Sequence, residues 1–216
     1  MKKLIPALLA VCMLTALMAA TVSADDHTDP IQSFITEETT NPDVVFPAGS
    51  VPAEAGLTEG IHLPVHALAL SMWEHDLSYD IGSAPFVWNA LYYTLSLCGE
   101  MDDRAQRTDD ALLLPSEAIN DFARALFAGL EQLPDLPAEL DGFISYDAAA
   151  DTYHLWLGDF ALTRTVLEGL TRRPDGTFAA QGTLLALEDD SPLCSFRITL
   201  LENDTMFGFS ILDVVF

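Results

Sequence analysis

The sequence predicts an α+β domain in which three helices pack on a curved antiparallel sheet of about five to six strands. Apolar residues recur at helical spacing between residues 61 and 130. Beyond Pro137, apolar and polar residues alternate as in half-buried strands, and turn sequences separate the alternating segments. Helices that precede a run of strands gather on one face of an antiparallel sheet.

The first helix is expected over residues 61–77, where Pro64 is tolerated because it falls in the first turn. The third helix follows an acidic loop and is capped by Ser116. Gly129 and Pro134 mark its end. Its apolar face is formed by Ile119, Phe122, Leu126 and Leu130.

The second helix is the most apolar of the three. Ser83 is its expected cap, Pro85 falls in its first turn, and the helix runs to Leu97. Only Asn89 and Ser96 give it a polar side. A helix that is apolar around most of its circumference belongs in the interior, so we expect this one to be largely buried.

Hairpins follow one another from the third helix to the C-terminus. Their clearest turn is Arg173-Pro174-Asp175-Gly176, because Pro presets φ and Gly accepts a positive φ. Alternation in the last two strands predicts one buried and one solvated face. The expected strands cover residues 143–146, 152–157, 160–172, 177–187, 194–200 and 207–211.

The N-terminus is typical of a bacterial secretory signal. Lys2 and Lys3 precede an apolar run over residues 4–20, and the segment closes on small residues. We expect cleavage after Ala24, which predicts a secreted or extracytoplasmic protein with no membrane association after cleavage.

Three regions therefore divide the chain. Residues 1–24 are the predicted signal peptide. Residues 25–60 lack periodicity and are rich in turn residues, so they are predicted as a flexible leader. Residues 61–216 are predicted as a single α+β domain.

The charge of the chain excludes one large class of partners. Its 216 residues carry nine Lys plus Arg against 33 Asp plus Glu, a net charge of −24. Loss of the predicted signal leaves seven Arg and no Lys, and the net charge becomes −26. Nucleic acid is not expected as a partner, because phosphate binding depends on clustered Lys and Arg. Self-repulsion of this size favours a soluble monomer.

Two cysteines, Cys98 and Cys194, remain after the predicted cleavage. In an oxidising compartment they can form one disulfide. Two buried free thiols are the alternative, because unpaired cysteine is among the most buried residue types. The mass of the unreduced protein distinguishes the two.

The order of three helices and a meander of strands over residues 61–216 resembles two architectures, the nuclear-transport-factor-2-like (NTF2-like) cone and the cystatin-like sheet wrapped on a helix. The chain also resembles uncharacterised secreted proteins of Gram-positive bacteria, through Phe-Val-Trp-Asn-Ala-Leu-Tyr-Tyr at 86–93 and Tyr-Asp-Ala-Ala-Ala-Asp-Thr-Tyr at 146–153. Such families have no assigned activity, so the resemblance implies a fold and no catalytic residue.

The motifs of common enzyme classes are missing. The sequence has no nucleophile elbow, no phosphate-binding loop, no dinucleotide fingerprint and no His-Glu-x-x-His, and we predict no cofactor. His62 and His66 share one helix face, as two metal ligands would. His75 falls on the opposite side, so no third ligand converges and we predict no metal site.

Acidic clusters at residues 100–110 and 188–190 offer oxygen ligands of the kind that calcium prefers. They lack the spacing of an EF-hand, and Arg104 and Arg107 partly neutralise the first cluster. A solvated loop is the favoured interpretation of both.

Aromatic residues provide the candidate ligand-binding set. Trp and Tyr rings combine a large apolar face with a polar edge and suit a sugar or peptide ligand, although core packing is the alternative role. The candidates are Trp88, Tyr92, Tyr93 and Trp156. A pocket enzyme, in which a carboxylate moves a proton, would instead use Tyr92, Tyr93, His154 and Asp159.

The favoured interpretation is a secreted domain that binds an extracellular glycan or peptide, or has a structural role, without catalysis. The pocket enzyme is one alternative, and a cystatin-like protease inhibitor is another. The hairpin tips expected at residues 174–176 and 203–204 are polar, which counts against an inhibitor with a hydrophobic tip.

Overall fold

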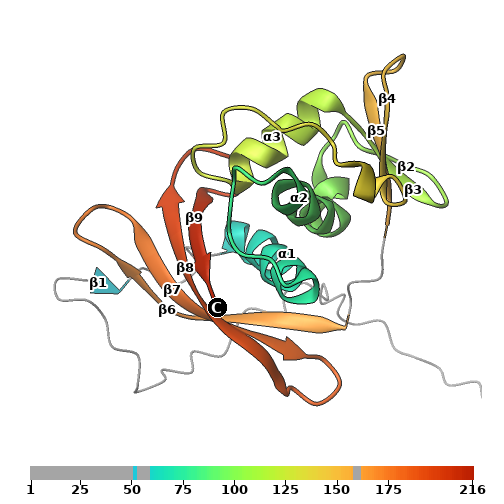
Figure 1. Cartoon of the computed structure of the whole chain (residues 1–216). Helices are drawn as coiled ribbons and strands as arrows, with labels where there is room; N and C mark the ends of the chain where they lie inside the picture. Colours follow the sequence, from blue (N-terminus) through green and yellow to red (C-terminus); the bar gives the residue numbers. More distant parts are fainter. Residues whose placement is uncertain (1–50, 53–58, 158–161) are drawn as a thin grey trace, which may run out of the picture. The chain divides into compact units, whose positions relative to one another are not determined.

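The computed structural model describes residues 51–52, 59–157 and 162–216. It contains three α-helices and two antiparallel sheets (Figure 1), which confirms the predicted α+β class. The predicted signal peptide, most of the predicted leader and Asp159 lie outside the described residues. None of the described helices is long and apolar enough to cross a membrane.

The helices begin close to their expected positions, but Ser116 is the first residue of the third helix and not its cap, because Pro115 occupies the cap position and makes no side-chain hydrogen bond. Ser83 caps the second helix by accepting a hydrogen bond from the backbone N–H of Phe86 at 3.4 Å, and Pro85 lies in the first turn, as predicted. The helices are α1 (Glu59–His75), α2 (Ala84–Cys98) and α3 (Ser116–Leu126), and two short 3-10 segments are η2 (Gly99–Met101) and η3 (Ala138–Leu140).

The third helix is shorter than predicted, because it ends at Leu126 and not near Leu130. Phe127 is extended and forms a parallel bridge with Ile211, and the N–H of Ala128 donates to the carbonyl of Ile211 at 2.9 Å. The chain therefore leaves the helix to cover the edge of a sheet, which helical periodicity alone did not reveal.

The strands were expected in one sheet, but the structure divides them between two. The first sheet has the order β1-β6-β7-β8-β9 and the second has the order β2-β3-β5-β4. The strands of the first sheet are β1 (Val51–Pro52), β6 (Thr163–Arg172), β7 (Phe178–Ala186), β8 (Pro192–Glu202) and β9 (Phe209–Val215). Those of the second are β2 (Gln106–Arg107), β3 (Ala111–Pro115), β4 (Ile144–Asp147) and β5 (Thr152–Trp156).

The second sheet forms because the acidic loop before α3 contains strands that the sequence analysis missed. The hairpin of β4 and β5 pairs with β3 and not with β6. In the first sheet, the predicted turn is confirmed: Gly176 has a φ of +86° and its N–H donates to Arg173 O at 3.0 Å.

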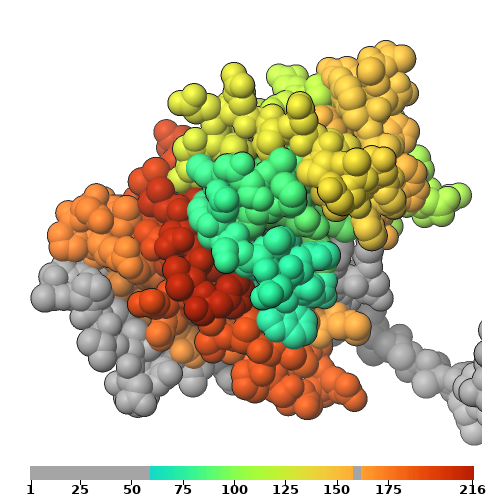
Figure 2. Space-filling view, in the orientation of Figure 1, coloured from blue at the N-terminus to red at the C-terminus, as the bar shows by residue number. Residues whose placement is uncertain are grey.

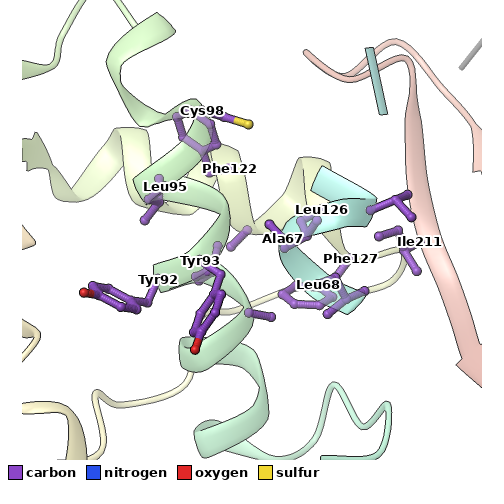
Figure 3. Close-up of a cluster of buried hydrophobic side chains, with 14 of the residues drawn as sticks. Ala67, Leu68, Tyr92, Tyr93, Leu95, Cys98, Phe122, Leu126, Phe127 and Ile211 are labelled. Carbon is purple, nitrogen blue, oxygen red and sulfur yellow. The ribbon is translucent and has the colours of Figure 1, made fainter. Parts of the chain in front are cut away.

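The helices lie between the two sheets. Helix α1 contacts β6, β7 and β9 of the first sheet and packs along α2. Helix α2 reaches the second sheet through Trp88, whose ring centroid lies 5.3 Å from that of Tyr153 on β5. Figure 3 shows side chains of α1, α2, α3 and β9 meeting in one buried cluster.

A glycine on β7 makes room for an aromatic ring on β8. Gly182 pairs with Phe196, and the Phe196 ring lies over the glycine with only 3% of the residue exposed. A Cβ added at Gly182 would overlap three atoms of that ring. Gly142, in contrast, has no atom within 4 Å of an added Cβ.

We therefore expect Gly182→Ala to lower the free energy of unfolding by about 2 kcal/mol, because the ring must leave its rotamer or the strands must separate. The matched change Gly142→Ala should leave stability within about 0.5 kcal/mol of the original. Urea denaturation monitored by circular dichroism measures both. Equal stabilities for the two variants would contradict the packing described.

Candidate functional site

Trp88 is a core residue and does not belong to a surface site. Its exposed fraction is 0%, its indole N–H donates to the carbonyl of Pro134 at 2.9 Å, and its ring packs on Tyr153. Both the apolar and the polar parts of the side chain are used inside the protein. Of the two roles considered for Trp88, the structure places it in core packing.

The other three predicted residues form a chain of contacts from α2 to β5. The Tyr92 hydroxyl donates to the backbone carbonyl of Trp156 at 2.5 Å. The rings of Tyr92 and Tyr93 meet edge to face with centroids 5.9 Å apart. The ring of Phe143, which the sequence analysis did not single out, packs at a tilt against Tyr92 with centroids 5.5 Å apart. We call these four residues the Tyr92–Trp156 surface.

The rings of the two tyrosines belong to the core, and both hydroxyls bind other groups of the protein. Tyr92 and Tyr93 are 6% and 5% exposed. Figure 3 shows both hydroxyl oxygens pointing away from Leu95 and Cys98. Burial raises the pKa of both phenols, so the hydroxyls stay protonated and donate hydrogen bonds at physiological pH.

Trp156 combines an exposed side chain with a backbone that is hydrogen-bonded on both sides. Its N–H donates to Phe143 O at 2.9 Å, and its carbonyl accepts the Tyr92 hydroxyl. Side chains alternate along β5, so the buried Leu155 faces the helices while Trp156 faces outward. The Trp156 residue is 41% exposed and Phe143 is 49% exposed.

A depression of about 460 Å³ opens beside Trp156. We call it the Trp156 depression, and its lining is Arg107, Asp109, Asp110, Trp156 and Leu157. The strand register creates it, because Ala111 of β3 pairs directly with Trp156 and follows Asp110 in the chain. The tip of the β2–β3 hairpin that carries the aspartates projects at the right of the space-filling view (Figure 2).

Asp109 and Asp110 occupy the two central positions of a tight turn. The Thr108 N–H donates to Ala111 O at 2.8 Å, and the Ala111 N–H donates to Thr108 Oγ1 at 3.0 Å. The turn therefore has hydrogen bonds that leave both aspartate side chains free to face solvent. Both residues are exposed.

The neighbouring arginines are already paired. Arg107 forms an ion pair with Glu100, and Arg104 binds Asp102 at 2.7 Å and Asp121 at 2.9 Å. The hydrogen bonds from Arg104 hold the pKa of Asp102 below its usual value. The first acidic cluster thus binds its own arginines. Among the described residues, no three His, Cys, Asp or Glu side chains gather as a metal site requires.

The opposite end of the Tyr92–Trp156 surface is polar. The Tyr93 hydroxyl donates to the Glu74 carboxylate, and His75 Nε2 lies 3.1 Å from the same hydroxyl. Because the single phenolic proton is given to Glu74, the His75 nitrogen must donate to the Tyr93 oxygen. Burial and the bond to Glu74 raise the Tyr93 pKa. These contacts fasten the end of α1 to α2.

The described residues do not supply the buried carboxylate that a pocket enzyme would need. No Asp or Glu belongs to the buried polar residues of the described chain. His154 lies on β5 opposite Ser145 and Leu113. Asp159, the proposed acid or base, falls outside the described residues.

A second, smaller depression of about 290 Å³ lies against strands β6 to β9 of the first sheet. Its polar lining includes Glu168, Gln181 and Arg197, with Phe216 at one side. It brings together none of the residues that the sequence analysis selected. We therefore centre the candidate site on Trp156.

His62 and His66 both contact the first sheet. His62 Nε2 lies 2.9 Å from Thr165 O, and His66 Nδ1 lies 3.0 Å from Thr165 Oγ1 on β6. His66 is buried, with only 6% of the residue exposed. Burial, with a further contribution from nearby His62, lowers the pKa of His66 to about 4.

This shift predicts a loss of stability in mild acid. The pKa of His66 is 6.5 in the unfolded chain and about 4 in the folded protein. Between these two pH values, His66 is therefore protonated in the unfolded chain and neutral in the folded protein. The contribution of His66 to the free energy of unfolding is therefore fully present above pH 6.5. It decreases by about 3 kcal/mol as the pH falls towards 4.

Urea unfolding between pH 7 and about pH 5 tests this, because most carboxylates are still ionised there. The variant His66→Gln, whose amide can still bind Thr165, should lose less stability over that range than the original protein. Identical pH profiles for the two proteins would show that His66 titrates normally.

The two cysteines among the described residues are free thiols in this structure. Cys98 is buried on α2, and Cys194 is half-buried on β8 opposite Leu184. Burial raises the pKa of the Cys98 thiol to about 12 and that of Cys194 less strongly. The reactive thiolate of Cys98 is therefore almost absent at neutral pH.

In the folded protein we expect iodoacetamide at pH 8 to modify Cys194 before Cys98, by at least about tenfold in rate. Denaturation without reductant should make both cysteines reactive, and mass spectrometry of the peptides locates each adduct. If neither cysteine reacts without reductant, the two form the disulfide and not free thiols.

We compared the chain with protein families, curated proteins and solved structures. No protein-family model, curated protein or solved structure matches the chain. The function must therefore be inferred from the geometry of the chain itself.

Proposed function

We propose that this chain is a secreted binding domain without catalysis, and that its ligand contacts the Tyr92–Trp156 surface. The observation that carries the proposal is the exposed indole of Trp156 on a backbone hydrogen-bonded to both Phe143 and Tyr92. A fixed aromatic face binds at low entropic cost, because little freedom is lost when the ligand arrives.

The ligand classes that suit this surface are peptides and sugars. Aromatic faces at Phe143 and Trp156 take apolar groups or the faces of sugar rings. The carboxylates of Asp109 and Asp110 accept hydrogen bonds from the same ligand. Secretion is part of the proposal and rests on the predicted signal peptide, and the N-terminal residue of the exported protein checks it.

The NTF2-like or cystatin-like architecture also remains a proposal. In its favour, α1 packs against a four-strand meander of β6 to β9. The second sheet is an addition to that pattern. Both features are compatible with a binding role, and neither implies a catalytic residue.

The protein supplies a matched control for the key residue. Trp73 on α1 is 42% exposed, almost the same as Trp156, but it is absent from the lining of the Trp156 depression. Trp88 is the only other tryptophan of the chain and is buried. Substitutions at Trp73 and Trp156 therefore remove similar exposed area at two different places.

We expect Trp156→Ala to weaken binding to ligands found on a glycan and peptide array by about tenfold, because a central aromatic contact is lost. Trp73→Ala should change the same affinities by less than about twofold. Isothermal titration calorimetry, which needs no tryptophan signal, gives the dissociation constants of the original protein and of both variants. If Trp156→Ala and Trp73→Ala retain the same ligands equally well, the proposed surface is wrong.

A further inference from the structure

The Trp156 depression joins an exposed indole to two carboxylates. Asp109 and Asp110 form no ion pair with any described residue. The only cation in the lining, Arg107, is paired with Glu100. The lining therefore presents two uncompensated negative charges next to an aromatic face.

This arrangement matches the chemistry of a guanidinium group. A flat cation stacks on an indole face, where the negative quadrupole of the ring attracts it. Its N–H groups also form a planar fork that binds carboxylates in pairs. A neutral sugar would use the aromatic face but would gain no charge attraction from Asp109 and Asp110.

The site is fixed by the fold before a ligand arrives. The register of β3 against β5 sets Ala111 opposite Trp156, and the two-residue turn holds Asp109 and Asp110 immediately before that pair. A long charged side chain on the protein would have to be ordered on binding, whereas these short side chains lose little freedom.

We propose that the Trp156 depression binds an arginine side chain of a basic peptide segment in a partner protein. This inference rests on the proposed function, since it names the ligand class of the same surface. Charge complementarity selects the occupant: the partner is cationic because the depression is anionic, and arginine is preferred to lysine because the indole offers a flat face.

The net charge of the whole protein also attracts basic peptides, so the experiment must separate the site from the general field. The general attraction is long-ranged and is screened by salt, whereas contact with Trp156 and the aspartates depends on particular residues. Variants that remove the same number of charges at two places distinguish these effects.

The probe is a fluorescein-labelled Gly-Ser-Arg-Gly-Arg-Ser-Gly peptide, with matched peptides in which Lys, Gln or Glu replaces both arginines. Fluorescence anisotropy at about 0.15 M salt measures each dissociation constant. We expect the arginine peptide to bind at least about tenfold more tightly than the glutamine peptide, and more tightly than the lysine peptide.

The double variant Asp109→Asn/Asp110→Asn should weaken binding of the arginine peptide by about tenfold while leaving the glutamine peptide unchanged. Asn is well tolerated in turns, so the hairpin should be preserved. The control double variant is Glu202→Gln/Asp204→Asn, which removes two exposed carboxylates near the β8–β9 turn. It should alter affinity by less than about twofold.

The outcomes separate this inference from the proposed function. Equal binding of the arginine and glutamine peptides, or equal weakening by the two double variants, would overturn arginine recognition. If Trp156→Ala nevertheless reduces binding to a neutral glycan, the Tyr92–Trp156 surface remains a binding site of another specificity. If Trp156→Ala matches Trp73→Ala for every probe, both proposals fail. Circular dichroism melting curves verify that each variant is folded.

Discussion

The requirement to cover two apolar helices on every side determines the arrangement of the other elements. Nine consecutive residues of α1, from Pro64 to Met72, are buried, and α2 is buried from Phe86 to Leu95 except at Asn89. A helix with one apolar stripe needs one packing partner, but α1 and α2 are apolar around most of their circumference and need partners on several sides. The first sheet covers α1, the two helices cover each other, and the second sheet covers the remaining side of α2. Without the second sheet, Trp88 would expose a large apolar side chain to water.

The candidate site lies where α2 and the end of β5 meet solvent. Tyr92 and Tyr93 bury their rings with the rest of α2, and each hydroxyl must find a partner because an unpaired buried polar group is costly. Tyr92 uses the carbonyl of Trp156, and Tyr93 uses Glu74 and His75. The hydrogen bond that the buried Tyr92 hydroxyl requires therefore also fixes the backbone of Trp156, whose ring faces outward. The same bond contributes to stability and holds a surface aromatic in place, so structural and binding roles are coupled at Trp156.

The helices and the C-terminal meander could be predicted from the sequence because their periodicities are local. Even the burial of α2 followed from its composition, but the element that covers it did not. The missing strand β3 is a five-residue apolar run inside an acidic segment, and a run of that length does not distinguish a strand from other buried structure. It pairs with β5, about forty residues later, through contacts that leave no local pattern. Because the sequence does not reveal this pairing, it also did not show that Trp88 is buried and Trp156 is exposed. Strand alternation around the buried Leu155 was the available signal that Trp156 faces outward.

The positions of the acidic residues in the structure say more about binding than the net charge does. With 33 carboxylates and so few cations, most acidic residues must lack a partner, so an unpaired aspartate indicates nothing by itself. Asp109 and Asp110 differ from the others by their position, on a hydrogen-bonded turn whose register places them beside an exposed indole. The general field raises the rate at which any cationic partner arrives, and it does so without selecting among them. Selection requires short-range contacts with fixed geometry, and the turn and the strand end supply that geometry in the described part of this chain.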